Sequence, residues 1–89
     1  MSHHLINQAW EIELRGSTKI VLLALCHLSA VSTCECTATI SRLAYICGMS
    51  DSGVRQQLAT LIELGRVDEL RDGRAVHYRV MVGRPDGHA

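Results

Sequence analysis

The 89-residue sequence has no excess of charge of either sign, because nine Lys and Arg residues balance nine Asp and Glu residues. A protein that holds nucleic acid by charge alone needs a surplus of basic residues, so this balance argues against non-specific binding. Long apolar runs are also missing: the longest, Ile20–Cys26, is far shorter than the roughly twenty residues of a membrane span. Residues 1–10 lack the basic cluster and apolar stretch of a signal peptide. We therefore expect a cytoplasmic protein without a membrane partner.

The sequence also lacks recognisable patterns for metal binding or catalysis. Cys34 and Cys36 near His27 do not have the spacing of common structural zinc sites, which place about two to four residues between paired cysteines. Without an export signal a disulfide scaffold is not expected either, and Cys26 and Cys47 are predicted to be small core residues. No Ser-His-Asp arrangement, phosphate-binding loop or pair of catalytic carboxylates can be identified. We expect no metal, no cofactor and no enzymatic activity.

The length allows one small domain, which we expect to span residues 17–82. Residues 1–16 should form an N-terminal arm or short helix that packs Trp10 on the core or an interface, and residues 83–89 a flexible tail. Apolar residues make up 47 % of the chain, which is typical of a globular protein and excludes disorder as its main state.

The first long helix is expected at residues 18–29, with Ser17 as its N-cap. Its apolar residues point in every direction around the helix axis. A surface helix would have a single apolar stripe. We therefore expect this helix either to lie at the centre of the domain or to face a second subunit.

Two further helices are predicted on either side of a tight turn. Thr39 can cap a helix that ends near Cys47, with one buried face made of Ile40, Leu43, Ala44 and Cys47. Gly48 can take the left-handed conformation that ends this helix, and Ser50 can cap the next one, at about residues 51–64. The inward residues of that third helix should be Val54, Leu58, Leu61 and Ile62. Its exposed face should carry Ser52, Gln56, Ala59 and Thr60, with Gly53 and Arg55 on the flanks.

After Gly65 the period of the pattern changes to two, which indicates strands. Residues 67–71 should form the first strand, and Asp72-Gly73 is a strong signal for a two-residue hairpin turn. The returning strand should carry Val76, Tyr78, Val80 and Val82 on one face. The predicted fold class is therefore α+β and mostly α, with three core helices followed by a two-stranded β-hairpin.

The apolar and glycine positions of the second and third helices and the following hairpin resemble a winged helix-turn-helix domain. The residues that carry the resemblance are Leu43, Ala44, Gly48, Ser50, Val54, Leu58, Leu61, Gly65 and Val67, with Arg71-Asp72-Gly73-Arg74 as the tip of the wing. Ala9-Trp10-Glu11, Ser17–Leu25 and Ile40–Ala44 are similar to helix-turn-helix domains of phage and plasmid replication and regulatory proteins. The resemblance covers about residues 9–82.

The resemblance implies binding of double-stranded DNA, with the third helix in the major groove and the wing on the adjacent backbone. Gln56 could then read adenine, and Arg55 could contact guanine or phosphate. Other candidate DNA contacts are hydroxyl groups, a glycine that allows close approach and wing arginines: Thr39, Ser41, Ser52, Gly53, Thr60, Arg71 and Arg74. A homodimer could present two such helices to a two-fold site.

A second hypothesis is a winged-helix module that binds a protein partner and no DNA. The zero net charge favours it, and so does Asp51 at the start of the third helix, because a carboxylate there would repel a phosphate. Glu63 adds another negative charge to the same helix. In that case the first long helix and the N-terminal arm would form the assembly surface.

Overall fold

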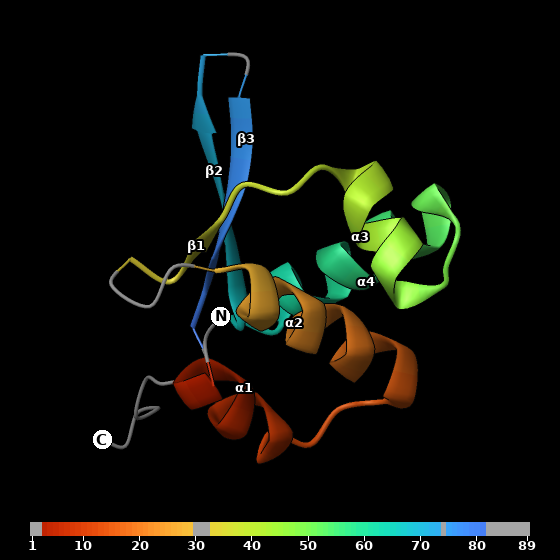
Figure 1. Cartoon of the computed structure of the whole chain (residues 1–89), viewed down its shortest axis with the longest axis vertical. Coiled ribbons are helices and arrows are strands. Elements are labelled where there is room, and N and C mark those ends of the chain that lie inside the picture. The colour runs from red at the N-terminus through yellow and green to blue at the C-terminus, as the bar shows by residue number, and fades with distance from the viewer. Residues whose placement is uncertain (1–2, 30–32, 74, 82–89) are drawn as a thin grey trace.

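The computed structural model describes residues 3–29, 33–73 and 75–81, which form four helices and a small sheet (Figure 1). The elements in chain order are α1 (His3–Trp10), α2 (Gly16–Leu28), β1 (Glu35–Cys36), α3 (Ile40–Cys47), α4 (Asp51–Glu63), β2 (Val67–Asp72) and β3 (Ala75–Val80). The predicted fold class is confirmed: three core helices, α2, α3 and α4, are followed by a β-hairpin wing formed by β2 and β3. The short strand β1 extends the hairpin into a three-stranded antiparallel sheet of order β1-β3-β2.

The turn between α3 and α4 has the local structure that the sequence predicts. The Thr39 side chain caps α3 by accepting a hydrogen bond from the Arg42 backbone N–H at 3.1 Å, and the Ser50 side chain caps α4 by accepting one from Gly53 at 3.1 Å. Between the two helices Gly48 has a φ of 68°, a left-handed conformation that side chains with a Cβ disfavour. Its backbone N–H and that of Met49 satisfy carbonyls of the last turn of α3, so the helix ends sharply at this point.

The core lies where α2 meets α4, α3 and the inner face of the sheet. Val21, Leu22, Leu25 and Cys26 of α2 are fully buried, together with Leu43, Val54, Leu61 and Val67. The central position expected for α2 is thus confirmed. Its remaining sides are partly covered by α1, but Ile20 stays 46 % exposed.

The predicted start of α2 is wrong, and of the two positions predicted for Trp10 the core is wrong, whereas the interface stays a prediction. Helix α2 begins at Gly16 with Arg15 at the cap position and no side-chain cap, and Thr18 in its first turn contacts α4. In α1, Ala9 is fully buried in the core and the half-buried Ile6 packs against it. Successive helical residues point about 100° apart, so Trp10 lies at the side of α1 and is 57 % exposed, with Lys19 Nζ 5.8 Å from its ring centre.

The sheet follows the predicted alternation, with a turn one residue later than expected. Tyr78 and Val80 of β3 are buried on the inner face and Val76 is half-buried, whereas Val82 lies outside the described residues. Asp72 pairs with Ala75, so the turn lies between these two residues and Asp72 still belongs to β2. None of the described helices is long and apolar enough to cross a membrane.

Candidate nucleic-acid interface

The outer side of α4 carries a stripe of exposed side chains. Ser52, Arg55, Gln56 and Ala59 are exposed, while Val54, Leu58 and Leu61 on the inner side are buried. We call the set Ser52, Arg55, Gln56 and Ala59 the α4 stripe. The prediction that Ser52 and Gln56 point outward is confirmed. What these side chains contact stays a prediction.

Two residues of α4 depart from their predicted positions. Thr60 is half-buried, because its hydroxyl folds back and donates a hydrogen bond to the Gln56 carbonyl at 3.2 Å. Ile62 was expected to point inward but is 36 % exposed, since it lies under the wing instead of under α2. The usable polar surface of α4 is therefore its first two turns.

Hydroxyl groups surround the N-termini of α3 and α4. Thr39 and Ser41 are both exposed at the start of α3. Because the Thr39 oxygen accepts its hydrogen bond from the backbone, its hydroxyl proton remains available to donate to another group. At the start of α4 the Ser50 and Ser52 hydroxyl oxygens lie 3.3 Å apart. Helix N-termini with free amides and hydroxyls suit anionic oxygens.

Gly53 lies against the cap of α4. A Cβ atom at this position would lie 3.2 Å from the Ser50 hydroxyl oxygen, which is closer than an ordinary van der Waals contact. The absence of a side chain therefore leaves the Ser50 cap undisturbed. It also leaves the backbone at the first turn of α4 uncovered between Ser52 and Val54.

The wing carries its positive charge beside a negative one. Arg71 of β2 is 71 % exposed, and its guanidinium lies 2.8 Å from the Glu69 carboxylate of the same strand. The predicted contact residue Arg74 lies outside the described residues. Arg71 is thus already paired with an acid in the free protein.

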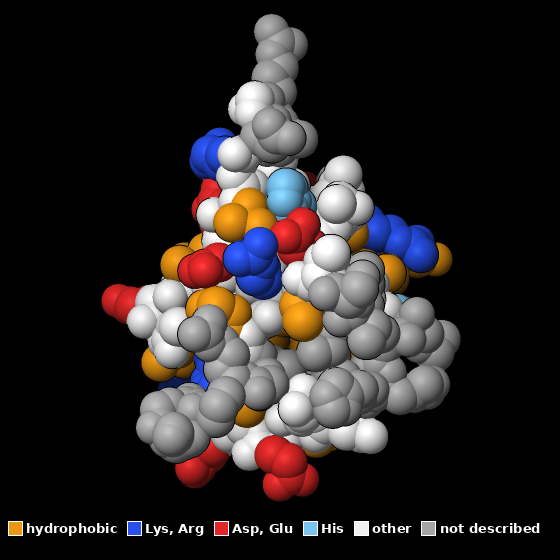
Figure 2. All heavy atoms as spheres, turned by 90° about the vertical axis from the view of Figure 1, so that its left-hand side faces the viewer, with side chains coloured by type: hydrophobic (Ala, Val, Ile, Leu, Met, Phe, Trp, Pro, Cys, Tyr) orange, Lys and Arg blue, Asp and Glu red, His pale blue; other side chains and the backbone are white. Residues whose placement is uncertain are grey.

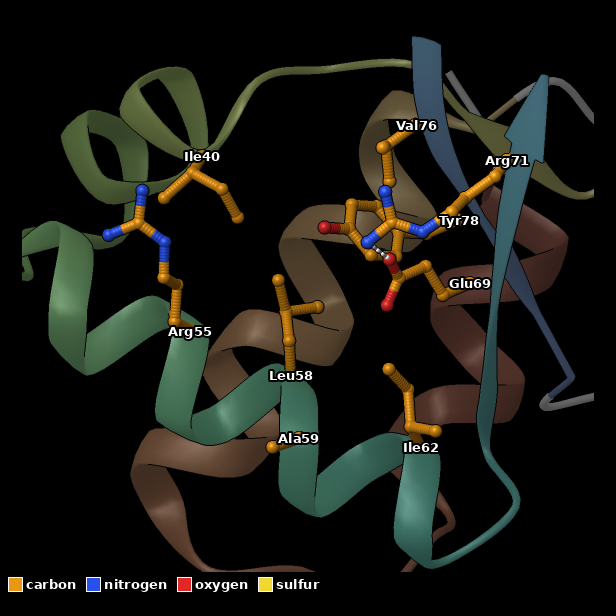
Figure 3. A pocket seen from close by; sticks show the side chains of 9 residues that line it. All are labelled: Ile40, Arg55, Leu58, Ala59, Ile62, Glu69, Arg71, Val76 and Tyr78. Atoms are coloured by element: carbon orange, nitrogen blue, oxygen red, sulfur yellow. Dashed lines mark ion pairs between the residues drawn. The ribbon is translucent and has the colours of Figure 1, made fainter. Parts of the chain in front are cut away.

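A pocket of about 390 Å³ separates α4 from the wing (Figure 3). We call it the wing pocket. Its apolar lining comes from α3, α4 and β3, and its charged lining comes from Arg55 at one end and from Glu69 and Arg71 at the other. The full set is Ile40, Arg55, Leu58, Ala59, Ile62, Glu69, Arg71, Val76 and Tyr78. The predicted site residues Arg55 and Arg71 therefore border one common space.

Tyr78 is a residue of this pocket that the sequence analysis treated as strand packing. It is 8 % exposed, and Figure 3 shows its hydroxyl directed into the pocket between Ile40 and Leu58. Burial raises the pKa of the phenol, and the facing carboxylate of Glu69, its cross-strand neighbour, raises it further. Tyr78 therefore remains a neutral hydrogen-bond donor. The sequence signal for this role was a residue with a polar hydroxyl, Tyr78, placed between two valines on the inner face of β3.

The orientation of α4 depends on a polar contact that the sequence analysis missed. The Thr18 hydroxyl, 3 % exposed, donates a hydrogen bond of 2.6 Å to the Gln57 side-chain oxygen. This bond joins the first turn of α2 to the middle of α4, next to Gln56. A threonine just before the apolar run of α2 was the sequence signal for it.

The outer face of the sheet mixes the two signs of charge. Glu35 of β1 lies 2.9 Å from Arg79 and 3.4 Å from the His77 ring, both on β3. Figure 2 shows basic and acidic side chains side by side on this face. Because its charges are mutually compensated, this face is a poorer candidate for DNA than α4.

The four cysteines are buried or half-buried. Cys26 and Cys36 are fully buried and Cys47 is half-buried, and burial raises the pKa of all three thiols, that of Cys26 to about 12. No group of three or more His, Cys, Asp or Glu side chains with metal-binding geometry occurs in residues 3–29, 33–73 and 75–81.

A second hollow lies on the helical side of the molecule. It has a volume of about 350 Å³ and runs between α1, α2 and α3. We call it the apolar groove; its lining residues are Ile6, Trp10, Ile20, Leu23, Ala24, His27, Ile46 and Cys47. Trp10, Ile20 and Ile46 are each more than a third exposed there.

Comparison with known proteins gives one match. The model of a family described as a helix-turn-helix domain matches residues 13–66, more than half of the chain. This segment contains α2, β1, α3 and α4 and ends just before the wing. No curated protein and no solved structure matches the sequence.

Proposed function

Because the chain belongs to the helix-turn-helix domain family, a class of DNA-binding domain, we propose that it binds double-stranded DNA sequence-specifically. Helix α4 enters the major groove and the wing lies on the adjacent backbone. The observation that carries this proposal is the α4 stripe: a row of exposed side chains on the helix that follows the Gly48 turn.

The chemistry of the α4 stripe suits base edges in the major groove. A glutamine amide can make paired hydrogen bonds to adenine, and an arginine can make them to guanine, so Gln56 and Arg55 are the proposed reading residues. Ala59, one turn further along, is small enough to lie against a thymine methyl group. Reading by a few such contacts fits a protein that has no general excess of positive charge.

The groups around the helix N-termini are the proposed phosphate contacts. Thr39, Ser41 and Ser52 offer exposed hydroxyls, and the backbone at Gly53 allows a phosphate to approach closely. Arg71 and Arg74 of the wing would touch the neighbouring backbone. Asp51 opposes such contacts, so we expect modest affinity for unrelated DNA and a clear preference for the correct sequence.

We further propose that the protein acts as a homodimer, in the cytoplasm, as a transcriptional regulator or replication-associated factor of the phage or plasmid kind. The apolar groove supports assembly, because Trp10 and Ile20 expose apolar surface that a second copy could cover. In Figure 1 α1 lies at the opposite end of the molecule from the hairpin tip. An interface at α1 would therefore leave the wing free for DNA.

A protein-binding module is the second candidate function. The observation that favours it is the same apolar groove, together with the pairing of Arg71 with Glu69, which lowers the positive charge of the wing. In this alternative α1 and α2 bind another protein and α4 remains in solvent.

Selection from a random pool of duplexes, followed by a salt titration of the recovered sequence, separates the two candidates. We expect an enriched motif, and an affinity that falls as salt rises because phosphate contacts release counterions. Arg55→Ala and Gln56→Ala should weaken the selected duplex by about tenfold each or more, the value of a lost base contact. Failure to enrich any motif at low salt would contradict DNA reading and favour the protein-binding alternative.

Arg15→Ala is the matched control for Arg55→Ala. It removes the same charge from an exposed residue in the α1–α2 connection, at the other end of the molecule from the hairpin tip (Figure 1). An equal loss of affinity in both variants would indicate that only net charge matters, which would contradict the proposed role of Arg55.

A further inference from the structure

We propose that the wing pocket binds a small amphipathic monocarboxylate, a compound with one carboxylate and a short apolar tail, and that this ligand competes with DNA. The claim that the pocket binds this ligand concerns the free protein and does not depend on the proposed function. The claim that the ligand competes with DNA rests on the proposed function, because it requires that DNA covers the same surface.

The shape of the pocket fits a small ligand. Its volume of about 390 Å³ lies in the lower part of the range of ligand sites. It is walled by two consecutive elements, α4 and the β2-β3 hairpin, with Ile40 of α3 at one end (Figure 3). Ligand sites typically combine such an apolar wall with a few converging polar groups.

The apolar tail has a matching surface. Leu58, Ala59 and Ile62 lie along one side of the pocket, and Val76 of β3 lies across from them. Ile62 is partly exposed although it belongs to the apolar pattern of α4. A ligand tail of a few methylene groups would remove this surface from water, which is favourable.

The carboxylate has two donors without a competing partner. Tyr78 is more than nine-tenths buried, its hydroxyl points into the pocket, and this hydroxyl makes no hydrogen bond to any residue in the described part of the chain. The Arg55 guanidinium, which lines one end of the pocket, makes no ion pair with a described residue. Because the Tyr78 hydroxyl is not fully enclosed by the protein, a ligand acceptor there would take the place of water as its hydrogen-bond partner.

The charges of the pocket select a monoanion. Arg71 is neutralised by Glu69 at 2.8 Å, which leaves Arg55 as the uncompensated charge among the lining residues. A carboxylate between Arg55 and the Tyr78 hydroxyl would lie on the Arg55 side of that hydroxyl, whereas Glu69 lies on the other side with its charge paired to Arg71. The second charge of a dianion would be repelled by the Glu69 carboxylate, and a neutral ligand would leave the charge of Arg55 without a partner.

Hexanoate is a suitable probe, with hexanamide as its neutral analogue and acetate as the anion without a tail. In an NMR titration of the ¹⁵N-labelled protein, hexanoate should shift the amide signals of α4 and the hairpin with saturable, about millimolar affinity. Tyr78→Phe removes only the hydroxyl and Arg55→Gln only the charge. Each should weaken hexanoate by about tenfold, as expected for a lost hydrogen bond to a charged group, whereas Arg15→Gln should not.

Three results would overturn the ligand assignment. Hexanamide or acetate could shift the same signals with equal affinity, Tyr78→Phe could titrate like the unmodified protein, or the shifted signals could map to the apolar groove. With a selected duplex, hexanoate should raise the apparent Kd for DNA in proportion to one plus the ratio of the hexanoate concentration to its own Kd, while hexanamide should not. If no duplex binds at all, the proposed function fails and the NMR titration still decides the ligand site; if hexanoate fills the pocket without changing the DNA affinity, only competition is refuted.

Discussion

Replacing Glu69 with Gln should strengthen binding to DNA while leaving the fold intact. Glu69 pairs with Arg71 at 2.8 Å, but the two side chains are 33 % and 71 % exposed, so the pair contributes at most about 1 kcal/mol to stability. Its removal frees the Arg71 guanidinium to contact a phosphate. One more phosphate contact changes the slope of log K against log salt by about −0.9, which corresponds to about eightfold tighter binding at 0.1 M salt.

Fluorescence anisotropy of a labelled duplex, measured across a series of salt concentrations, gives both the affinity and the slope. Glu13→Gln is the matched control, since it removes an equal charge from an exposed residue of the α1–α2 connection. If Glu69→Gln changes neither the affinity nor the salt slope, or if Glu13→Gln has the same effect, then the wing does not lie on the DNA backbone as proposed.

Three further predictions concern the scaffold. Gly48→Ala should lower the free energy of unfolding by about 1–2 kcal/mol, because a residue with a Cβ is strained at a φ of +68° and no atom lies near enough to offset that strain by contact. Gly16→Ala is the control and should not destabilise the protein. Urea unfolding of both variants tests this. Thr18→Val should cost about 1–2 kcal/mol by leaving the Gln57 oxygen unpaired, and full stability of this variant would refute the role given to the 2.6 Å bond. Because the pKa of Cys26 is raised to about 12, its thiol keeps its proton in the folded state at pH values where the unfolded state has lost it. The free energy of unfolding should therefore fall by about 1.4 kcal/mol per pH unit between about pH 9 and pH 12. Cys26→Ala should flatten that pH dependence, and an unchanged pH profile in this variant would contradict it.

Local signals made the core of the fold predictable. The caps at Thr39 and Ser50 and the left-handed Gly48 depend on residues within one turn of each other, so the sequence alone places α3, α4 and the turn between them. The hairpin was predictable for the same reason, although its turn lies one residue later. The outward position of Ser52 follows from the helical period once α4 is placed.

Contacts between distant segments were not predictable. Trp10 and the start of α2 depend on how α1 and α4 pack against α2, and no local pattern encodes that packing. The wing pocket likewise exists only because the hairpin folds back over α4, which brings Tyr78 near Arg55. The candidate residues of α4 were therefore identifiable, but the cavity that joins them to the wing was not.

The central claim is that the outer side of α4 lies in the major groove of DNA, and NMR mapping of the ¹⁵N-labelled protein with a selected duplex tests it most directly. We predict that the amide signals of residues 52–59 and of the hairpin shift or broaden most, and that α1 is affected little or only through dimer formation. Shifts concentrated in α1 and α2, with residues 52–59 unchanged, would contradict the claim.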